Sequence, residues 1–211
     1  MTLGERLSLI VITDHVLAQP RSIVEVVGEA LVAGAPAVQL RSKALSPRDS
    51  FGVAVLLRSL TEASGALFFV NDRLDLALAA RADGVHLGPD DLPVADARSA
   101  VPPDFLIGYS TDDPVEALSA QRDGADYLGC GTVFPTTSKR DAGATIGTAG
   151  LAKVVEAVSI PVVGIGGISP ERVREVAATG AVGSAAIGAV MTAGNVPEVV
   201  KGLLEPWMHL G

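Results

Sequence analysis

Residues 30–40 read ALVAGAPAVQL, in which a helical end and Gly34 are followed by a short apolar run. The same order returns at residues 120–130, AQRDGADYLGC, and at residues 176–186, VAATGAVGSAA. A glycine directly after a helix is a common helix-ending signal, because glycine adopts the left-handed backbone conformation without strain. The recurring transition from helix to glycine to strand indicates a chain built from repeated α/β units.

Eight short apolar runs, rich in β-branched residues, are predicted to be strands, and polar or glycine residues and helical stretches lie between them. The runs are Leu7–Thr13, Ala37–Leu40, Leu67–Val70, Gly84–Leu87, Leu106–Tyr109, Tyr127–Cys130, Pro161–Ile165 and Ser184–Ile187. Strands this short, apolar on both faces, are typical of a buried parallel sheet. Eight such units in 211 residues predict an α/β fold, a (β/α)8 TIM barrel that forms a single domain over residues 1–211. An open doubly wound sheet is the weaker alternative, because no GxGxxG follows the first strand.

The start signals of several helices are local and polar. Ser22–Ala33 and Pro47–Ala63 have apolar residues at helical spacing, and Ser46 precedes Pro47 as an N-cap. The same signal predicts helix starts at Asp113-Pro114, Ser169-Pro170 and Asn195-Val196-Pro197.

Composition excludes several classes of protein. The 16 basic and 24 acidic residues give a net charge of −8, which disfavours general nucleic-acid binding because that binding rests on positive charge. No apolar run is long enough for a membrane span, and no signal peptide is predicted. The one cysteine, Cys130, excludes an internal disulfide and fits a reducing compartment, so we expect a cytoplasmic protein. The oligomeric state stays open, and a homo-oligomer is compatible with the sequence.

In a parallel barrel, the residues that follow the strands share one face, and that face holds the active site. After the second predicted strand come Gln39, Arg41 and Lys43, whose side chains share one side because alternate residues in an extended chain do so. Two cations and an amide at this spacing suit a diphosphate. Taken alone, the arginine and the lysine are better explained as solvated surface residues.

Carboxylates follow the third and fourth predicted strands. Asn71 and Asp72 come after the third, and Asp90 and Asp91 after the fourth. Asp72 and Asp91 are candidate ligands of one Mg²⁺, which takes one or two protein carboxylates and completes its shell with water and phosphate oxygens. Helix N-capping is the alternative for Asn71 and Asp72, and also for Asp90 before a helix at Pro93.

Two residues of the next strands have simpler interpretations. His86 lies within an apolar strand, where a structural histidine with one buried partner is expected. Ser110 follows the fifth strand without a GxSxG elbow, which indicates hydrogen bonding and not covalent catalysis.

The longest polar loop, residues 131–141, follows the sixth strand and combines hydroxyls with Lys139. Such a loop is suited to phosphate binding and to closing over a substrate, although a surface loop has the same composition.

The last two strands end in small residues. Gly166-Gly167 follows the seventh strand, and Ile187-Gly188 ends the eighth. Successive glycines let backbone N–H groups approach an oxyanion, and many barrels bind phosphate after strands seven and eight. The sequence therefore predicts two anion sites: one with cations and a metal ion, and one with backbone donors.

Five stretches of this sequence, in this order, resemble the thiamine-phosphate synthase family. They are VQLRSK, FVNDRLDLALAARADGVHLGPDDLP, IGYST, GADYLGCGTVFPTTSKRDAG and PVVGIGGIS. The resemblance implies that 4-amino-2-methyl-5-(diphosphooxymethyl)pyrimidine condenses with a thiazole phosphate to give thiamine phosphate and diphosphate. It further implies a dissociative mechanism, in which diphosphate leaves before the thiazole nitrogen attacks.

The resemblance also implies a role for each matching residue. Substrate binding falls to Gln39, Arg41, Lys43, Asn71, Ser110, Thr136, Ser138, Lys139, Gly167, Ile187 and Gly188, of which Arg41, Lys43, Ser110 and Lys139 are also catalytic, and Mg²⁺ binding falls to Asp72 and Asp91. The chain departs from the family at Pro89, Asp112 and Gly188, where glutamine, histidine and serine are usual. A related thiazole tautomerase, or a phosphate-sensing barrel without catalysis, is the alternative. The cationic residues and carboxylates favour the synthase.

Overall fold

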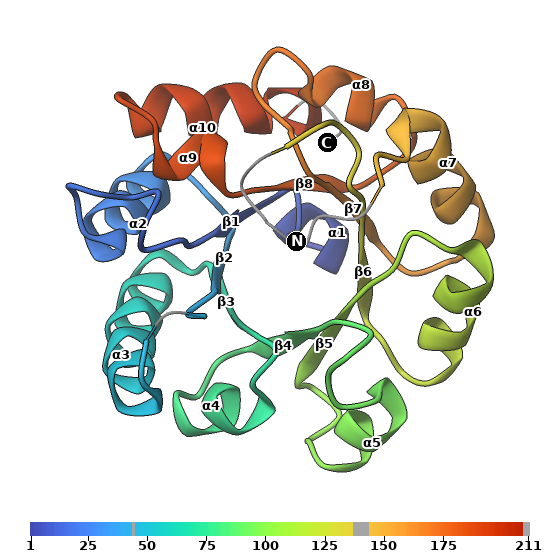
Figure 1. Cartoon of the computed structure of the whole chain (residues 1–211), viewed down its shortest axis with the longest axis horizontal. Helices are drawn as coiled ribbons and strands as arrows, with labels where there is room; N and C mark the ends of the chain where they lie inside the picture. Colours follow the sequence, from blue (N-terminus) through green and yellow to red (C-terminus); the bar gives the residue numbers. More distant parts are fainter. Residues whose placement is uncertain (44, 137–143, 209–211) are drawn as a thin grey trace.

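The computed structural model describes residues 1–43, 45–136 and 144–208. Its eight strands follow one another around a closed barrel, and every neighbouring pair is parallel, as Figure 1 shows. The strands are β1 (Leu9–Ile12), β2 (Ala37–Leu40), β3 (Leu67–Asn71), β4 (Gly84–Leu87), β5 (Leu106–Ser110), β6 (Tyr127–Cys130), β7 (Val162–Ile165) and β8 (Gly183–Ala186). The predicted TIM barrel is confirmed. That all of residues 1–211 form one domain stays a prediction.

Most helices form the outer layer of the barrel, whereas the first, next to the N-terminus, lies within the ring of strands in the view of Figure 1. The helices are α1 (Leu3–Arg6), α2 (Ile23–Val32), α3 (Pro47–Ser64), α4 (Leu74–Ala79), α5 (Val94–Ser99), α6 (Pro114–Arg122), α7 (Gly147–Ala157), α8 (Val173–Ala177), α9 (Gly188–Met191) and α10 (Val196–Leu204), with a short 3-10 helix, Glu205–Trp207, after them. In the described ranges, α3 is the longest helix, and no helix is both long and apolar enough to cross a membrane.

Most predicted helix starts are confirmed by the side chains that cap them. Ser22 and Ser46 cap α2 and α3, because their hydroxyls accept from the backbone N–H three residues on. Asp113 and Asn195 cap α6 and α10 in the same way. The start predicted at Ser169-Pro170 is wrong: α8 begins at Val173, because the intervening residues form a turn.

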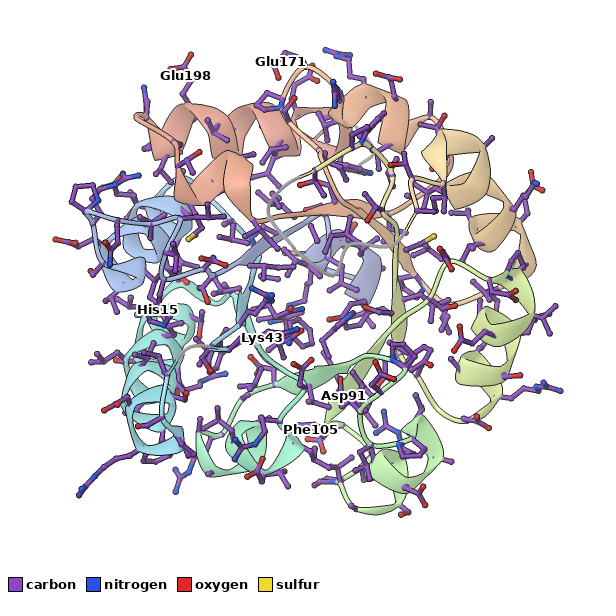
Figure 2. The ribbon with its side chains drawn as sticks, in the orientation of Figure 1. His15, Lys43, Asp91, Phe105, Glu171 and Glu198 are labelled. Carbon is purple, nitrogen blue, oxygen red and sulfur yellow. The ribbon has the colours of Figure 1, made fainter. Side chains whose placement is uncertain are left out.

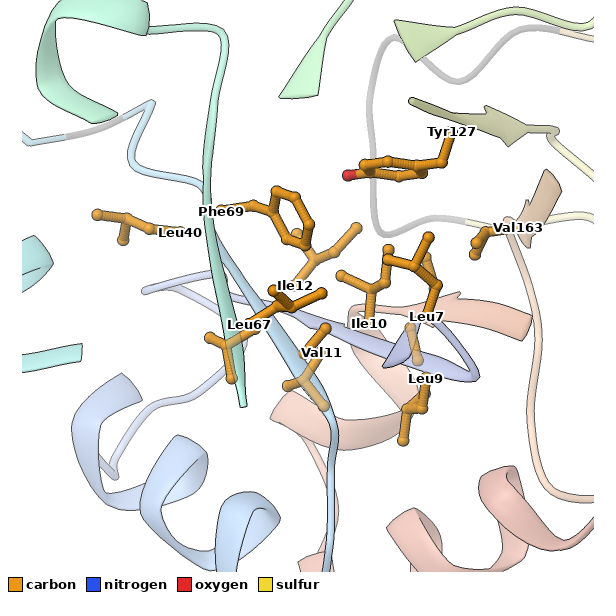
Figure 3. Close-up of a cluster of buried hydrophobic side chains, with 14 of the residues drawn as sticks. Leu7, Leu9, Ile10, Val11, Ile12, Leu40, Leu67, Phe69, Tyr127 and Val163 are labelled. Carbon is orange, nitrogen blue, oxygen red and sulfur yellow. The ribbon is translucent and has the colours of Figure 1, made fainter. Parts of the chain in front are cut away.

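The register of the strands defines which side chains fill the barrel. Side chains paired across neighbouring strands point to the same side of the sheet, so one chain of pairs links Ile12, Gln39 and Phe69. The ring of Phe69 lies 5.3 Å, centroid to centroid, from that of the fully buried Tyr127. Figure 3 shows these two rings tilted relative to each other, near Ile10 and Ile12. These buried side chains fill part of the barrel interior.

Two aspartates fasten the amino end of the barrel. Asp83, just before β4, accepts from the backbone N–H of Phe68 at 2.7 Å and pairs with Arg58. Asp126, just before β6, accepts from the backbone N–H of Ile107 at 2.7 Å and also pairs with an arginine, Arg98. Each carboxylate thereby ties a strand to its neighbour and to a helix. This end of the barrel is structural, and chemistry is expected at the opposite end.

Candidate active site

A cavity of about 310 Å³ opens at the carboxyl ends of the strands. Residues of seven strand ends line it: Arg41, Lys43, Asn71, Asp72, His86, Gly88, Pro89, Asp90, Asp91, Ser110, Gly129, Gly131, Thr132, Thr136, Ile165, Gly166, Gly167, Ile168, Ala185, Ala186, Ile187, Gly188 and Ala189. Figure 2 shows Lys43 and Asp91 near the centre of the barrel, whereas Glu171 and Glu198 lie on its outside. Strand ends far apart in the sequence thus contribute to one site.

Arg41 is held at the mouth by the end of β1. Its guanidinium lies 3.2 Å from the Asp14 carboxylate, and both side chains are largely buried. Its backbone N–H donates to the Thr13 hydroxyl at 3.0 Å. The other Asp14 oxygen accepts from the backbone N–H groups of Val16 and Leu17. The cation is therefore fixed before any ligand arrives, and the residue that fixes it, Asp14, was missed in the sequence although it also follows a strand.

Asp72 enters the cavity from a constrained backbone. Its φ of 65° is left-handed, which aspartate tolerates better than most residues, and its N–H donates to the carbonyl of His86 at 2.8 Å. Non-glycine residues in this region often mark functional sites. The N-cap of α4 is Arg73, so Asp72 does not occupy the capping position that was its alternative.

Asp91 belongs to a closed turn. Its carboxylate accepts from the N–H of Gly88 at 2.7 Å, and its own N–H donates to the Gly88 carbonyl at 3.1 Å. The turn closes with Pro89 inside it, so this departure from the family pattern leaves Asp91 at the cavity. Asp90 also lines the cavity, and Pro93, not Asp90, is the N-cap of α5.

The carboxylates fit Mg²⁺ better than a metal that needs a full protein cage. Asp72 and Asp91 line the same cavity. Within residues 1–43, 45–136 and 144–208, no group of three or more His, Cys, Asp or Glu side chains is arranged to hold a metal ion. Two carboxylates with water and substrate oxygens are the usual shell of Mg²⁺.

The opposite wall is made of backbone. Gly166 and Gly167 have φ values of 101° and 62°. A Cβ on Gly167 would lie 2.6 Å from the carbonyl oxygen of Pro135, so no larger residue fits there without movement. The N–H of Phe134 donates to the Gly166 carbonyl at 3.0 Å, which ties the start of the strand-6 loop to this wall. Thr136, further along that loop, lines the cavity beside it.

His86 connects the cavity to the interior. Its Nε2 lies 2.8 Å from the Ser110 hydroxyl, and its Nδ1 lies 3.0 Å from the Tyr127 hydroxyl. Burial raises the pKa of Tyr127, and a hydrogen bond from the Gln39 side chain opposes that rise. His86 is buried and partnered, as expected of a structural histidine, but it also lines the cavity.

Comparison with known proteins identifies the family of this chain. The family described as thiamine monophosphate synthase matches residues 9–190. The chain belongs to the thiamine monophosphate synthase family. A thiamine-phosphate synthase of Pyrococcus furiosus is 49% identical over 203 residues, which cover 96% of each chain. One from Desulfitobacterium hafniense is 42% identical over 202 residues, 96% of this chain and 98% of the relative. The solved thiamine phosphate pyrophosphorylase from Pyrococcus furiosus superposes with a TM-score of 0.89 at 48% identity, covering 97% of each chain.

The structure brings most of the residues implied by resemblance to the thiamine monophosphate synthase family to one cavity. They are Arg41, Lys43, Asn71, Asp72, Asp91, Ser110, Thr136, Gly167, Ile187 and Gly188. Gln39 does not line the cavity. It lies two residues before Arg41, nearer the amino end of the barrel, and is 3% exposed. Ser138 and Lys139 lie outside the described residues.

Proposed function

We propose that this chain is a thiamine-phosphate synthase. It joins 4-amino-2-methyl-5-(diphosphooxymethyl)pyrimidine to a thiazole phosphate and releases diphosphate. Membership of the family and near full-length similarity to thiamine-phosphate synthases support the reaction. We further propose that residues 1–211 form one domain and that the protein is cytoplasmic, the second supported by the single buried cysteine.

One observation carries the proposal: a single cavity has two walls of different chemistry. One wall presents Arg41, Lys43 and the carboxylates that include Asp72 and Asp91, and the other presents glycine backbone at Gly167 and Gly188. A diphosphate suits the first wall, because arginine, lysine and a divalent cation together neutralise its charge. A monophosphate suits the second, since N–H groups of glycine approach its oxygens closely.

Mg²⁺ held by Asp72 and Asp91 would supply the charge that stabilises the departing diphosphate. The other roles belong to the chain itself. Arg41 and Lys43 bind the diphosphate of the pyrimidine substrate and favour its departure as an anion. Asn71 and Ser110 orient the pyrimidine by hydrogen bonds.

The second substrate is held by its phosphate against the backbone wall. Thr136, Ser138 and the N–H groups at Gly167, Ile187 and Gly188 bind that phosphate, whereas Lys139 contacts the pyrimidine substrate or its diphosphate. The C–O bond to diphosphate breaks first, and the thiazole nitrogen then forms the new C–N bond with the pyrimidine methylene carbon. No protein nucleophile is required, so catalysis rests on charge stabilisation and on alignment of the two substrates.

A coupling assay tests this function. Purified chain is incubated with both substrates and Mg²⁺, and thiamine phosphate and diphosphate are measured by chromatography. We expect equal amounts of the two products, and none when the metal is chelated or either substrate is left out. Absence of thiamine phosphate in the complete mixture would contradict the proposal.

Two variants connect the assay with the site. Asp72→Asn removes a metal-binding charge with little change of shape, and we expect turnover to fall roughly a hundredfold while the unfolding temperature stays unchanged. Asp75→Asn is the matched control, because Asp75 pairs with Arg73 on the outside of α4 and does not line the cavity. Equal losses of activity in both variants would contradict the assignment of Asp72.

A further inference from the structure

We propose that Gln39, Tyr127 and His86 form a buried chain of hydrogen bonds that holds the Ser110 hydroxyl as a donor toward the pyrimidine substrate. The identity of the ligand rests on the proposed function. The series of hydrogen bonds itself rests on contacts within the barrel. Ser110 is the residue that touches the substrate, and the other three are positioning residues.

The contacts form one line from the barrel core to the cavity. Gln39 interacts with Tyr127 and lowers the pKa of its hydroxyl, which lies 3.0 Å from His86 Nδ1. His86 Nε2 lies 2.8 Å from the hydroxyl oxygen of Ser110, which lines the cavity. Tyr127 is fully buried, and Gln39 and His86 are 3% and 9% exposed. Water therefore has little access to compete for these groups.

The direction of the chain follows from the number of protons that each group holds. The neutral phenol of Tyr127 holds one proton, and His86 Nδ1 lies 3.0 Å from its oxygen in the buried interior. The phenol proton is then available for His86 Nδ1. A neutral imidazole has one acceptor and one donor nitrogen, so the proton of His86 lies on Nε2 and is donated to Ser110. The Ser110 O–H is left for a ligand.

The acceptor atoms of the substrates fit the same direction. Phosphate oxygens and ring nitrogens of the substrates accept hydrogen bonds, and the carboxylates of Asp72 and Asp91 only accept when ionised. If the hydrogen bonds ran in the opposite direction, Ser110 would donate its proton to His86. Its lone pairs would then face the acceptor atoms of the substrate, which is unfavourable. A donor at Ser110 therefore attracts an acceptor atom of the pyrimidine and rejects an analogue with a donor there.

Packing keeps the chain in one arrangement. A Cβ on Gly108 would lie 2.3 Å from Tyr127 Cζ and 2.5 Å from His86 Nδ1. A Cβ on Gly129 would lie 3.0 Å from His86 Cε1. The two glycines thus leave space that the two rings fill. Close packing against these two strands therefore restricts movement of both rings.

The tautomer of His86 is the direct test, and it needs no activity. Protein labelled with ¹⁵N-histidine is studied by a long-range ¹⁵N–¹H correlation spectrum, and the His86 signals are assigned as those missing from His86→Gln. We expect a protonated Nε2 and an unprotonated Nδ1 at neutral pH. A protonated Nδ1 with a bare Nε2, or an imidazolium, would overturn the proposal.

Tyrosine variants test the link that lies farthest from the substrate. Tyr127→Phe removes the donor to His86 and keeps the ring against Phe69. We expect kcat/KM for the pyrimidine substrate to fall roughly five- to tenfold, the effect of about one hydrogen bond, while KM for thiazole phosphate is unchanged. Tyr109→Phe is the control, because its hydroxyl donates to Glu116 outside the cavity. Equal effects of the two variants would overturn the proposal.

Histidine variants test whether the chain acts through Ser110. His86→Gln keeps an N–H near the hydroxyl, and His86→Met fills the volume without a donor. We expect Gln to retain most of kcat/KM, Met to lose as much as Ser110→Ala, and the double variant His86→Met/Ser110→Ala to lose no more than Ser110→Ala alone. Additive losses would overturn the proposal. If the protein had no synthase activity, the proposed function would fail. The tautomer of His86 would still test the proposed hydrogen bonds independently of activity.

Discussion

Gly108 is the position where one added methyl group tests the packing of the site most sharply. Gly108 lies in β5, paired in register with both His86 and Tyr127. Its φ is not left-handed, so Gly108→Ala introduces no backbone strain, and its effect is steric. The new Cβ would lie 2.3 Å from Tyr127 Cζ and 2.5 Å from His86 Nδ1. Ordinary carbon contacts are about 3.5–4.0 Å, so at least one ring must move by more than about 1 Å.

The size of the effect follows from two costs. Overpacking of a rigid core costs about 1–3 kcal/mol, and loss of the hydrogen bond between the rings adds about 1 kcal/mol. We therefore expect Gly108→Ala to lower the free energy of unfolding by about 2–4 kcal/mol. For a chain of this length, that is a fall in Tm of roughly 4–16 °C.

Thermal and urea unfolding, followed by circular dichroism, measure this change. Gly52→Ala is the matched control: Gly52 lies in α3, and its added Cβ would meet no atom within 4 Å apart from its chain neighbours and the backbone of its own helix. We expect that variant to gain about 0.5–1 kcal/mol, because alanine is the better helix former. A Gly108→Ala protein as stable as the natural chain, with unchanged turnover, would refute the packing described for the two rings.

Three further predictions concern other parts of the molecule. Asp126→Ala removes the acceptor for the Ile107 N–H and the partner of Arg98, so we expect a loss of about 2–3 kcal/mol in urea unfolding with KM unchanged; a large rise in KM would contradict a purely structural role. Burial raises the pKa of the Cys130 thiol to about 12, so a thiol reagent should label it in urea but not in the native protein at neutral pH; rapid native labelling would contradict its burial. Burial also lowers the pKa of His15 below 6.5, against the opposing charge of Asp14, so protonation disfavours the folded state. Stability should fall relative to His15→Gln as pH decreases from about 7 to about 5, and parallel pH profiles would contradict this assignment.

Local signals in the sequence predicted the barrel well. The strands Ala37–Leu40, Gly84–Leu87 and Tyr127–Cys130 have their predicted bounds, because each is a compact apolar run between polar or glycine residues. Boundaries failed where hydrophobicity continues past the strand. Leu7–Thr13 was predicted as a strand, but β1 begins at Leu9, since Leu7 is the C-cap of α1. Apolar character marks burial, and it does not separate a strand from the turn before it.

The site could be predicted only in part, because depth and long-range partners are not local properties. Alternation along the strand placed Gln39 and Arg41 on the same side, but it could not show that Gln39 lies a layer deeper and contacts Tyr127. The partners of His86 lie 41 and 24 residues away, and only closure of the barrel brings them together. Asp14 was visible as a polar residue at a strand end, yet its partner Arg41 lies on another strand.

Equilibrium titration with the two kinds of anion tests the central claim most directly. Inorganic diphosphate and thiazole phosphate are each titrated into the natural protein and Arg41→Met by calorimetry, with Mg²⁺ and with a chelator. We predict that diphosphate requires Mg²⁺ and binds roughly ten- to a hundredfold more weakly to Arg41→Met, as expected for loss of a charge-assisted contact. Thiazole phosphate should bind alike in all four conditions. If the affinities for both anions fall together, or if the two anions displace each other from one site, the two-wall account of the cavity is wrong.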